Sequence, residues 1–186
     1  MTSLPVALRA NTWPCLVVGG GRVATRKVRS LLEAQASVTV VAPKISVEIA
    51  ALAALHGLTM HEREFQPSDC VGARIVVTAT NRTEVYQLAA VDGTKIGALI
   101  NRADDADSGD LAFGAVARMG NVSIMVATEG VNPAVARWLR DHIAETLTPT
   151  IARLDALLDA VDGEPSRRSY EAINEQMSTS TEGTGA

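Results

Sequence analysis

Aromatic residues are scarce in this 186-residue sequence: they make up 3% of it, whereas hydrophobic residues as a whole make up 47%. The core must therefore consist mainly of Val, Leu, Ile and Ala, a composition that suits a parallel β-sheet covered by helices. The length is sufficient for one α/β domain and a small appendage.

Cysteine is also scarce, and no metal-binding pattern is present. Cys15 and Cys70 are far apart in the chain, which gives neither a disulfide framework nor the spacing of metal ligands. The three histidines, His56, His61 and His142, do not cluster either. We therefore expect reduced thiols and no metal site.

Long apolar runs and an excess of positive charge are missing as well. No apolar run is long enough to span a bilayer, and no charged and then apolar signal peptide is recognisable. The net charge of −4 argues against nucleic acid as the main partner. We expect a cytoplasmic protein without membrane or nucleic-acid partners.

The most informative stretch lies between residues 15 and 27. Cys15–Val18 predicts a short buried strand, and the residues after Gly21 predict a helix. Between them a G-x-G-x-x-A pattern has small residues at its three marked positions: Gly19, Gly21 and Ala24. In a dinucleotide-binding turn these positions allow the tight turn, the approach of a pyrophosphate and close helix packing. A plain glycine turn is the alternative.

Strands and helices alternate along the first 110 residues. Strands are expected at 4–8, 15–18, 37–42, 58–64, 74–80 and 96–100, and helices at 22–34, 47–55 and 84–91. This alternation predicts an α/β fold with a Rossmann-like, doubly wound parallel sheet. Ligands bind at the carboxyl ends of such strands, so the site is expected at the segments 19–23, 43–44, 78–81 and 101–105.

The pattern changes after residue 110. Strands at 111–117 and 122–127 predict a ribbon outside the parallel sheet, which is marginal alone and is expected to pack on a second subunit. Asn132 and Pro133 are typical of a helix start, and Pro149 is expected to precede a further helix. The expected organisation is a Rossmann domain at 1–110, a dimerisation and substrate region at 111–147, a small helical segment at 148–177 and a disordered tail at 178–186.

One part of the dinucleotide fingerprint is missing. An acidic residue normally ends the second strand and binds the adenosine ribose. This sequence has Ala42, Pro43 and Lys44 there. The absence weakens a standard dehydrogenase interpretation, and Lys44 leaves NADP open beside NAD.

The chain resembles precorrin-2 dehydrogenases, a family that includes the dehydrogenase/ferrochelatase modules of siroheme synthases. The resemblance covers about residues 4–147 in the family's order and spacing. It rests on Val17-Val18-Gly19-Gly20-Gly21-x-Val23-Ala24-x-Arg26-Lys27, Val38-Thr39-Val40-Val41-Ala42-Pro43, Ala79-Thr80, Asn101 with Asp104, and Thr128-x-Gly130-x-x-Pro133. The family's second strand commonly ends in Ala-Pro, so the missing acid agrees with this resemblance. Departures at Asn81, Tyr86 and Gly114 indicate a divergent member.

The resemblance implies a homodimeric enzyme that oxidises precorrin-2 to sirohydrochlorin with NAD⁺, in siroheme or cobalamin biosynthesis. A bifunctional form that also inserts Fe²⁺ or Co²⁺ is one alternative. A non-catalytic, NAD-sensing Rossmann module is another.

The implied roles fall on the matching positions. Cofactor contacts are expected at Gly19, Gly20, Gly21, Arg22, Val23, Pro43, Lys44 and Thr80. The family's essential carboxylate corresponds to Asp104, with Asp105 as the nearest rival and a solvated acidic loop as the alternative. Candidates for binding the polycarboxylate substrate are Asn101, Arg102, Thr128, Gly130, Asn132 and Arg137. For the last two, a helix cap and an exposed helix face are the alternatives.

Overall fold

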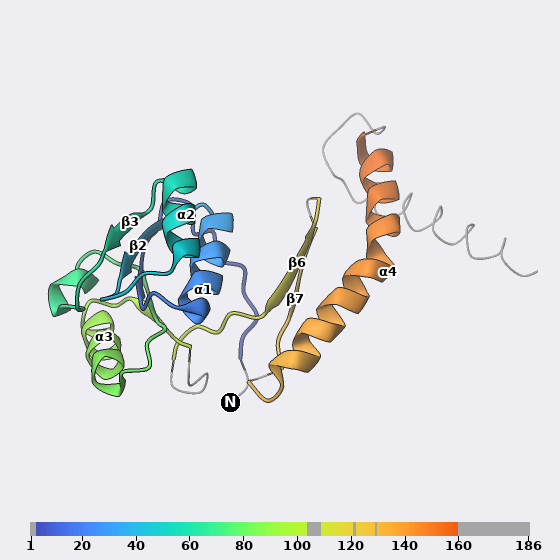
Figure 1. Ribbon diagram of the computed structural model, residues 1–186. Helices are drawn as coiled ribbons and strands as arrows, with labels where there is room; N and C mark the ends of the chain where they lie inside the picture. The colour runs from blue at the N-terminus through green and yellow to red at the C-terminus, as the bar shows by residue number, and fades with distance from the viewer. Residues whose placement is uncertain (1–2, 104–108, 121, 129, 160–186) are drawn as a thin grey trace, which may run out of the picture. The chain divides into compact units, whose positions relative to one another are not determined.

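The computed structural model describes residues 3–103, 109–120, 122–128 and 130–159, with side chains described as far as residue 152. The chain divides into two compact units, and the division falls between Phe113 and Gly114. The first unit contains a five-stranded sheet with its helices, and the second contains a two-stranded ribbon and a long helix (Figure 1).

The sheet of the first unit is entirely parallel. Its strands are β1 (Pro14–Val18), β2 (Ser37–Val41), β3 (Thr59–His61), β4 (Ile75–Thr78) and β5 (Leu99–Arg102), in the spatial order β3-β2-β1-β4-β5. Val18 is in register with Val41 on one side and Thr78 on the other, so three strands end at the same level. This topology confirms the predicted Rossmann-like fold.

Helices cover both faces of this sheet. They are α1 (Arg22–Glu33), α2 (Val47–His56), the 3₁₀ helix η1 (Pro67–Cys70) and α3 (Thr83–Lys95). Alternate residues of β1 serve the two faces: Val17 packs in a cluster with α1 and α2, whereas Leu16 packs with η1 and α3. Figure 1 shows α1 and α2 on one side of the sheet and α3 on the other. The core is mainly aliphatic, as the composition predicts.

Three strand predictions in this unit need correction. The strand expected at 96–100 is β5, which begins only at Leu99 because α3 runs to Lys95 and Gly97 turns the chain with a φ of +74°.

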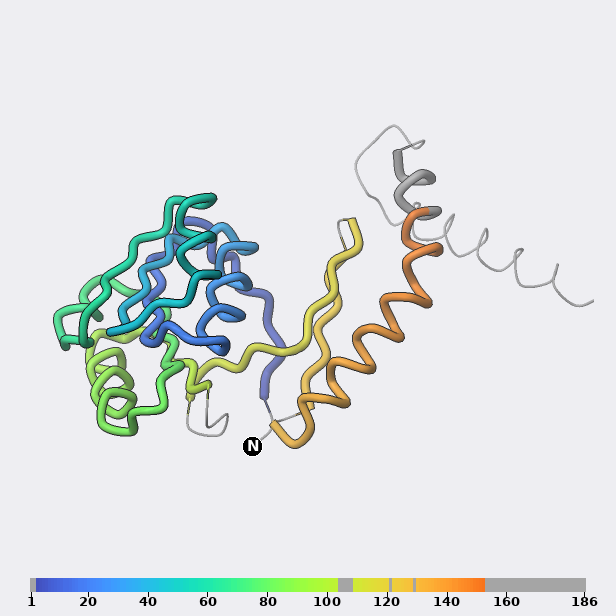
Figure 2. Tube along the Cα trace, viewed as in Figure 1, coloured from blue at the N-terminus to red at the C-terminus, as the bar shows by residue number. Residues whose placement is uncertain are grey.

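Residues 4–8 form no strand: Leu4 is 82% exposed, and Pro5 has no N–H group to donate to a sheet. Figure 2 traces the path of the chain from this segment into β1. The chain joins the fold at Ala10, which is buried in the core, and at Trp13, whose carbonyl accepts a hydrogen bond from Ser37 N. The strand predicted at 58–64 is only the three-residue β3, which pairs with β2 alone.

The second unit is a ribbon packed on one helix. Strands β6 (Ala115–Met119) and β7 (Val122–Val126) are antiparallel, and α4 (Pro133–Asp159) packs on both. The first ribbon strand therefore starts four residues later than the predicted 111–117. The part of the predicted helical segment 148–177 beyond residue 159, and the tail predicted at 178–186, lie outside the described residues.

The prediction that Pro149 separates two helices is wrong. Helix α4 continues through Pro149 and bends part-way along its length (Figure 1). Proline lacks an N–H group and crowds the preceding turn, which bends a helix that tertiary packing otherwise maintains. In the adjacent turn Thr148 Oγ1 donates a hydrogen bond of 2.6 Å to the carbonyl of Ala144. None of the helices in the described ranges has the length and apolar character needed to cross a bilayer.

Candidate functional site

The candidate site begins where the strand order of the sheet reverses. After β1 the chain enters α1 on one face, and after β4 it enters α3 on the other. The connections therefore diverge beyond the carboxyl ends of β1 and β4, the point at which open α/β sheets bind their ligands. The glycine turn, residues 19–21, lies at this point.

Gly19 and Gly20 are held tightly by the neighbouring connections. Gly19 has a φ of +130°, and a side chain there would collide with the carbonyl oxygen of Ala79. A side chain at Gly20 would collide with the carbonyl oxygen of Lys44. Gly19 N donates to the Val41 carbonyl and Ser46 N donates to the Gly20 carbonyl, both at 2.9 Å. Close backbone approach therefore requires glycine at both positions.

Gly21 has the opposite surroundings. A Cβ atom at this position would meet no other atom within 4 Å. Gly21 is also the N-cap of α1, it provides no side-chain cap, and the first turn of α1 contains no acidic residue. The first N–H groups of a helix lack partners within it and carry partial positive charge. This open end fits a pyrophosphate, the group that the glycine pattern predicts.

Two buried or half-buried hydroxyl groups fix this helix start. Thr25 Oγ1 donates to the Gly21 carbonyl at 3.1 Å and lies 3.2 Å from Ser46 Oγ. Ser46 in turn caps α2, because its Oγ accepts a hydrogen bond from Ile49 N. The N-termini of α1 and α2 are thereby tied together. Sequence reasoning did not identify Thr25 or Ser46.

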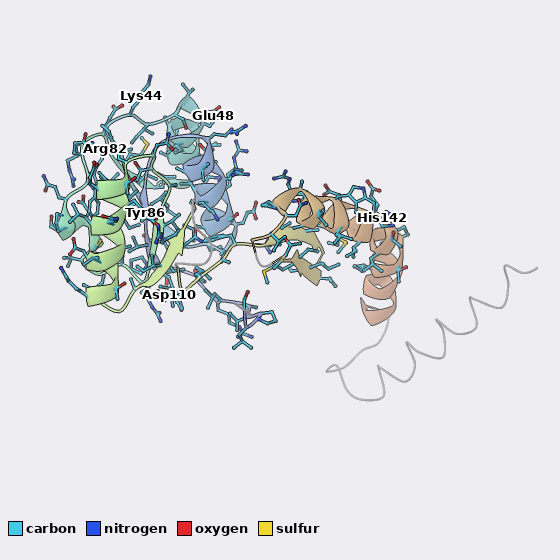
Figure 3. The ribbon with its side chains drawn as sticks, turned by 90° about the horizontal axis from the view of Figure 1, so that it is seen from below. Lys44, Glu48, Arg82, Tyr86, Asp110 and His142 are labelled. Atoms are coloured by element: carbon cyan, nitrogen blue, oxygen red, sulfur yellow. The ribbon has the colours of Figure 1, made fainter. Side chains whose placement is uncertain are left out.

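Two cationic residues lie next to the glycine turn: Arg22 follows Gly21 in the chain, and the backbone of Lys44 lies against Gly20. The side chains of Arg22 and Lys44 are exposed, and that of Val23 is half-buried. Lys44 points away from the body of the unit, on the side of the unit where Arg82 also lies (Figure 3). Arg22 and Lys44 can both approach an anion at the turn without the free-energy cost of burying a charge.

A small hollow adjoins the glycine turn. Its lining comes from the ends of β1 and β2, the β3–η1 segment and the start of α3: Val18, Gly19, Val41, Ala42, Pro43, Glu64, Phe65, Thr80, Arg82 and Val85. Across it, Arg82 Nη1 donates to both carboxylate oxygens of Glu64 at 2.6 Å. Pro43 and Thr80 were predicted cofactor positions, whereas Glu64, Phe65 and Arg82 were not. The signal that indicates them is their position just after β3 and β4, at the same edge of the sheet.

The end of β5 contains the predicted substrate residues Asn101 and Arg102. Asn101 is 3% exposed, and its Nδ2 donates to the Leu111 carbonyl at 2.6 Å. The Arg102 guanidinium lies 3.8 Å from the ring centre of Tyr86. Asp104 and Asp105 lie outside the described residues. Asp110, the last acid of this segment, accepts a hydrogen bond from Ile100 N and so fixes the chain after β5.

The remaining predicted substrate residues belong to the second unit. The Asn132 side chain accepts hydrogen bonds from Ala134 N and Val135 N, both at 3.1 Å, as expected of an N-cap. Thr128 Oγ1 accepts from Asn132 N, and Gly130 has a φ of +76°. Arg137 is exposed. Thr128 and Asn132 therefore serve in a helix cap, and the substrate role of this segment stays a prediction.

On the same helix, Arg140 forms an ion pair with Asp141 at 2.6 Å.

Within the described part of the chain, burial strongly shifts the pKa of three titratable groups. Burial raises the pKa of the Cys15 and Cys70 thiols to about 11, so both are held as neutral thiols. Burial, followed by the nearby Arg26 charge, lowers the pKa of Lys27 to about 8. The Lys27 ammonium lies 4.2 Å from the ring centre of Phe113. Lys27 of the Arg-Lys motif therefore packs on an aromatic ring.

Comparison with known proteins gives relatives over most of the chain. The chain is 37% identical to the siroheme synthase of Methylococcus capsulatus over 160 residues, which are 84% of this chain and 34% of the relative. It is 34% identical to the siroheme synthase of Chromobacterium violaceum over 184 residues, 94% of this chain and 39% of the relative. The chain thus spans about a third of the length of the curated relatives it matches.

Among solved structures, the fold is similar to SirC, precorrin-2 dehydrogenase, with a TM-score of 0.75 and 24% sequence identity. The similarity covers 93% of this chain and 88% of that chain. As the resemblance predicted, the chain is similar in sequence to siroheme synthases and in fold to a precorrin-2 dehydrogenase.

A family model described as "Putative NAD(P)-binding" matches residues 6–115, which include every strand of the parallel sheet and the glycine turn. The match agrees with the open helix N-terminus at Gly21 and confirms the prediction of a nicotinamide dinucleotide cofactor. The chain belongs to this NAD(P)-binding family.

Proposed function

We propose that the protein catalyses the NAD-dependent oxidation of precorrin-2 to sirohydrochlorin. The observation that carries this proposal is the open N-terminus of α1 at Gly21, at the reversal point of a Rossmann-like sheet. The residues around Gly21 would hold the pyrophosphate of the dinucleotide, whose nicotinamide would supply the hydride acceptor. The similarity to siroheme synthases and to the SirC fold supports the choice of substrate.

The chain's own residues bind the cofactor, orient the substrate and take up the proton that the substrate releases. The main-chain N–H groups at the start of α1 hold the pyrophosphate, with Arg22 and Lys44 offsetting its charge. Asp104 accepts the proton that leaves the substrate with the hydride. Arg102, Arg137 and the loop 128–132 bind the carboxylates of the tetrapyrrole.

The protein acts as a homodimer through the second unit. Large apolar side chains there are exposed although a two-stranded ribbon provides little core of its own: Val116, Val122, Met125, Val135 and Trp138 are each at least 38% exposed. Covering them on a second copy would remove this surface from water. A cytoplasmic location stays a prediction.

The proposal is tested by supplying precorrin-2 anaerobically and following NADH and the coloured product together. Wild-type protein should form both with equal stoichiometry, and only with NAD⁺. Asp104→Asn should lower turnover about 100-fold or more while NAD⁺ still binds, whereas Asp105→Asn should retain turnover within a few-fold.

Other outcomes would contradict it. Unchanged turnover in Asp104→Asn removes Asp104 from the mechanism. Tight NAD⁺ binding without any pigment favours the non-catalytic sensor. Because the relatives are siroheme synthases, the product should also be offered Fe²⁺ or Co²⁺ against an enzyme-free control, which tests the bifunctional form.

A further inference from the structure

The hollow beside the glycine turn has an unusual charge arrangement. The end of β2 contributes Ala42 and Pro43 to its lining and no acid, although an acid here normally binds the adenosine ribose. The nearest charges along the chain, Arg22 and Lys44, are both positive and exposed. Taken alone, these residues would favour a dinucleotide with an additional 2′-phosphate.

A carboxylate reaches the same hollow from another segment. Glu64 follows β3 and lines the hollow together with Ala42 and Pro43. Both of its oxygens accept from Arg82 Nη1 at 2.6 Å, and the side chains of Glu64 and Arg82 remain 59% and 54% exposed. The pair is therefore accessible to a ligand, and the carboxylate retains lone pairs for a ribose hydroxyl.

The backbone that presents Glu64 is built rigidly. Arg63 makes a two-pronged ion pair with Asp69, with Nη1 and Nη2 at 2.8 and 2.6 Å from its two oxygens. The same Nη1 donates to the Glu64 carbonyl at 2.9 Å, and Asp69 also accepts from Gln66 N. The Asp69 side chain is only 8% exposed. Its charge-assisted hydrogen bonds with Arg63 therefore hold the backbone of residues 63–69 in place.

We propose that Glu64, held by Arg82, replaces the missing acid of β2 and sets the preference for NAD over NADP. This inference rests on the proposed dinucleotide binding at the glycine turn. The Glu64 carboxylate accepts a hydrogen bond from the adenosine ribose and repels a 2′-phosphate. Arg82 orients it, and its charge moderates that repulsion.

The test measures the dissociation constants of NAD⁺ and NADP⁺ by calorimetry on the full chain, without substrate. Removing the negative charge with Glu64→Gln leaves Arg82 facing the hollow, so the ratio Kd(NADP⁺)/Kd(NAD⁺) should fall about tenfold. Removing the positive charge with Arg82→Gln should raise the same ratio about threefold or more. Glu62→Gln is the matched control, because Glu62 is exposed in the same segment and does not line the hollow; its ratio should stay within about twofold of the wild type.

Opposite shifts for the two variants support the inference. Unchanged ratios in both, or shifts in the same direction, overturn it while leaving the proposed function intact, provided that wild-type protein binds NAD⁺. If wild-type protein binds neither dinucleotide, the proposed function fails and the inference fails with it. Circular dichroism of each variant verifies the fold, which these exposed substitutions should not disturb.

Discussion

Gly19 and Gly21 are two residues apart in one turn, yet they are glycine for different reasons. Gly19 needs its positive φ and the close approach of Ala79, whereas Gly21 faces open space. We expect Gly19→Ala to destabilise the protein by about 2–4 kcal/mol, because a backbone clash adds to the strain of a positive φ. Gly21→Ala should leave the free energy of unfolding within about 0.5 kcal/mol but weaken NAD⁺ binding about tenfold or more.

Urea unfolding and calorimetric titration of both variants provide the measurements. A Gly21→Ala protein that binds NAD⁺ as tightly as the wild type would show that the open space is not where the pyrophosphate lies. A Gly19→Ala protein of normal stability would contradict the packing described at the turn.

Asp69 gives the first unit a pH dependence of known sign. The hydrogen bond from Arg63 holds the pKa of Asp69 below its usual value, with the backbone bond from Gln66 acting in the same direction. A lowered folded-state pKa contributes stability that is complete above the unfolded value of about 3.9 and is lost as the pH falls below it. Asp69→Asn should therefore lower the free energy of unfolding by about 1 kcal/mol at pH 7 and flatten its decline at acid pH.

Urea unfolding between pH 7 and pH 3 measures this difference. The difference in free energy of unfolding between wild type and variant should narrow as the pH falls, since protonation of Asp69 removes the same charge that the substitution removes. A gap that stays constant over this range would assign the loss to packing around Asp69.

Single residues differ in how far the sequence reveals them. Gly19 and Gly21 could be predicted because their role depends on local backbone and on a fixed spacing. Thr25 and Ser46 could not, because their contact depends on where two helix N-termini meet in space. Glu64 and Arg82 are 18 positions apart, and only the parallel strand order β3-β2-β1-β4 brings them to one hollow.

At the scale of elements, α4 contains Pro149, which has no N–H group and so removes one hydrogen bond from the helix. Pro149→Ala restores an N–H donor to the preceding turn and removes the ring's steric conflict. The substitution also raises the conformational entropy of the unfolded chain, which offsets about 0.4–1 kcal/mol of the stabilisation of the folded helix. We expect the variant to be more stable by about 1–2 kcal/mol and to show a straighter, more helical α4.

Thermal unfolding and far-ultraviolet circular dichroism measure this change. Lower stability in Pro149→Ala would mean that the bend of α4 is itself required by a contact, such as one with a second copy of the chain.

Long periodic elements followed from the sequence, and short or interrupted ones did not. The apolar stripe of α1 and the Val-rich runs of β2 and β4 predicted their type and approximate limits. The expected strand at 4–8 failed because Pro5 and an exposed Leu4 give no reason to join a sheet whose edges are formed by β3 and β5. Pro149 was given too much weight, since tertiary packing on β6 and β7 maintains a helix that local propensity would end.

For the whole molecule, the exposed apolar surface of the second unit makes dimerisation testable. Trp138 is 63% exposed and stacks only on the His142 ring among its described aromatic contacts, at 5.3 Å between ring centres. Light scattering should give twice the chain mass for the wild type. Trp138→Glu should weaken the dimer about tenfold or more, because it places a charge on that surface, whereas Glu145→Gln on the same helix should not.

A wild-type monomer at micromolar concentration would contradict the dimer. A Trp138→Glu protein that remains fully dimeric would place the interface elsewhere on the second unit.

The parallel-sheet fold of the first unit was the most predictable property, and the chemistry of the site the least. Alternating strands and helices around one glycine turn are enough to specify a doubly wound sheet and its ligand-binding edge. The carboxylate expected at Asp104 and the substrate residues of the second unit came from resemblance, since an isolated acid or arginine in a loop has no pattern that distinguishes catalysis from solvation.

The central position of β1 has a consequence for motion. This strand pairs on both sides, with β2 and β4, and it leads directly into the glycine turn. Amide protons of Leu16, Val17 and Gly19 should therefore exchange with deuterium only when the entire first unit unfolds, whereas those of β3 at the sheet edge exchange through local opening. The strand beneath the dinucleotide site then stays folded for as long as the first unit does. Any conformational change that limits ligand entry or release must therefore occur in the loops that surround the site.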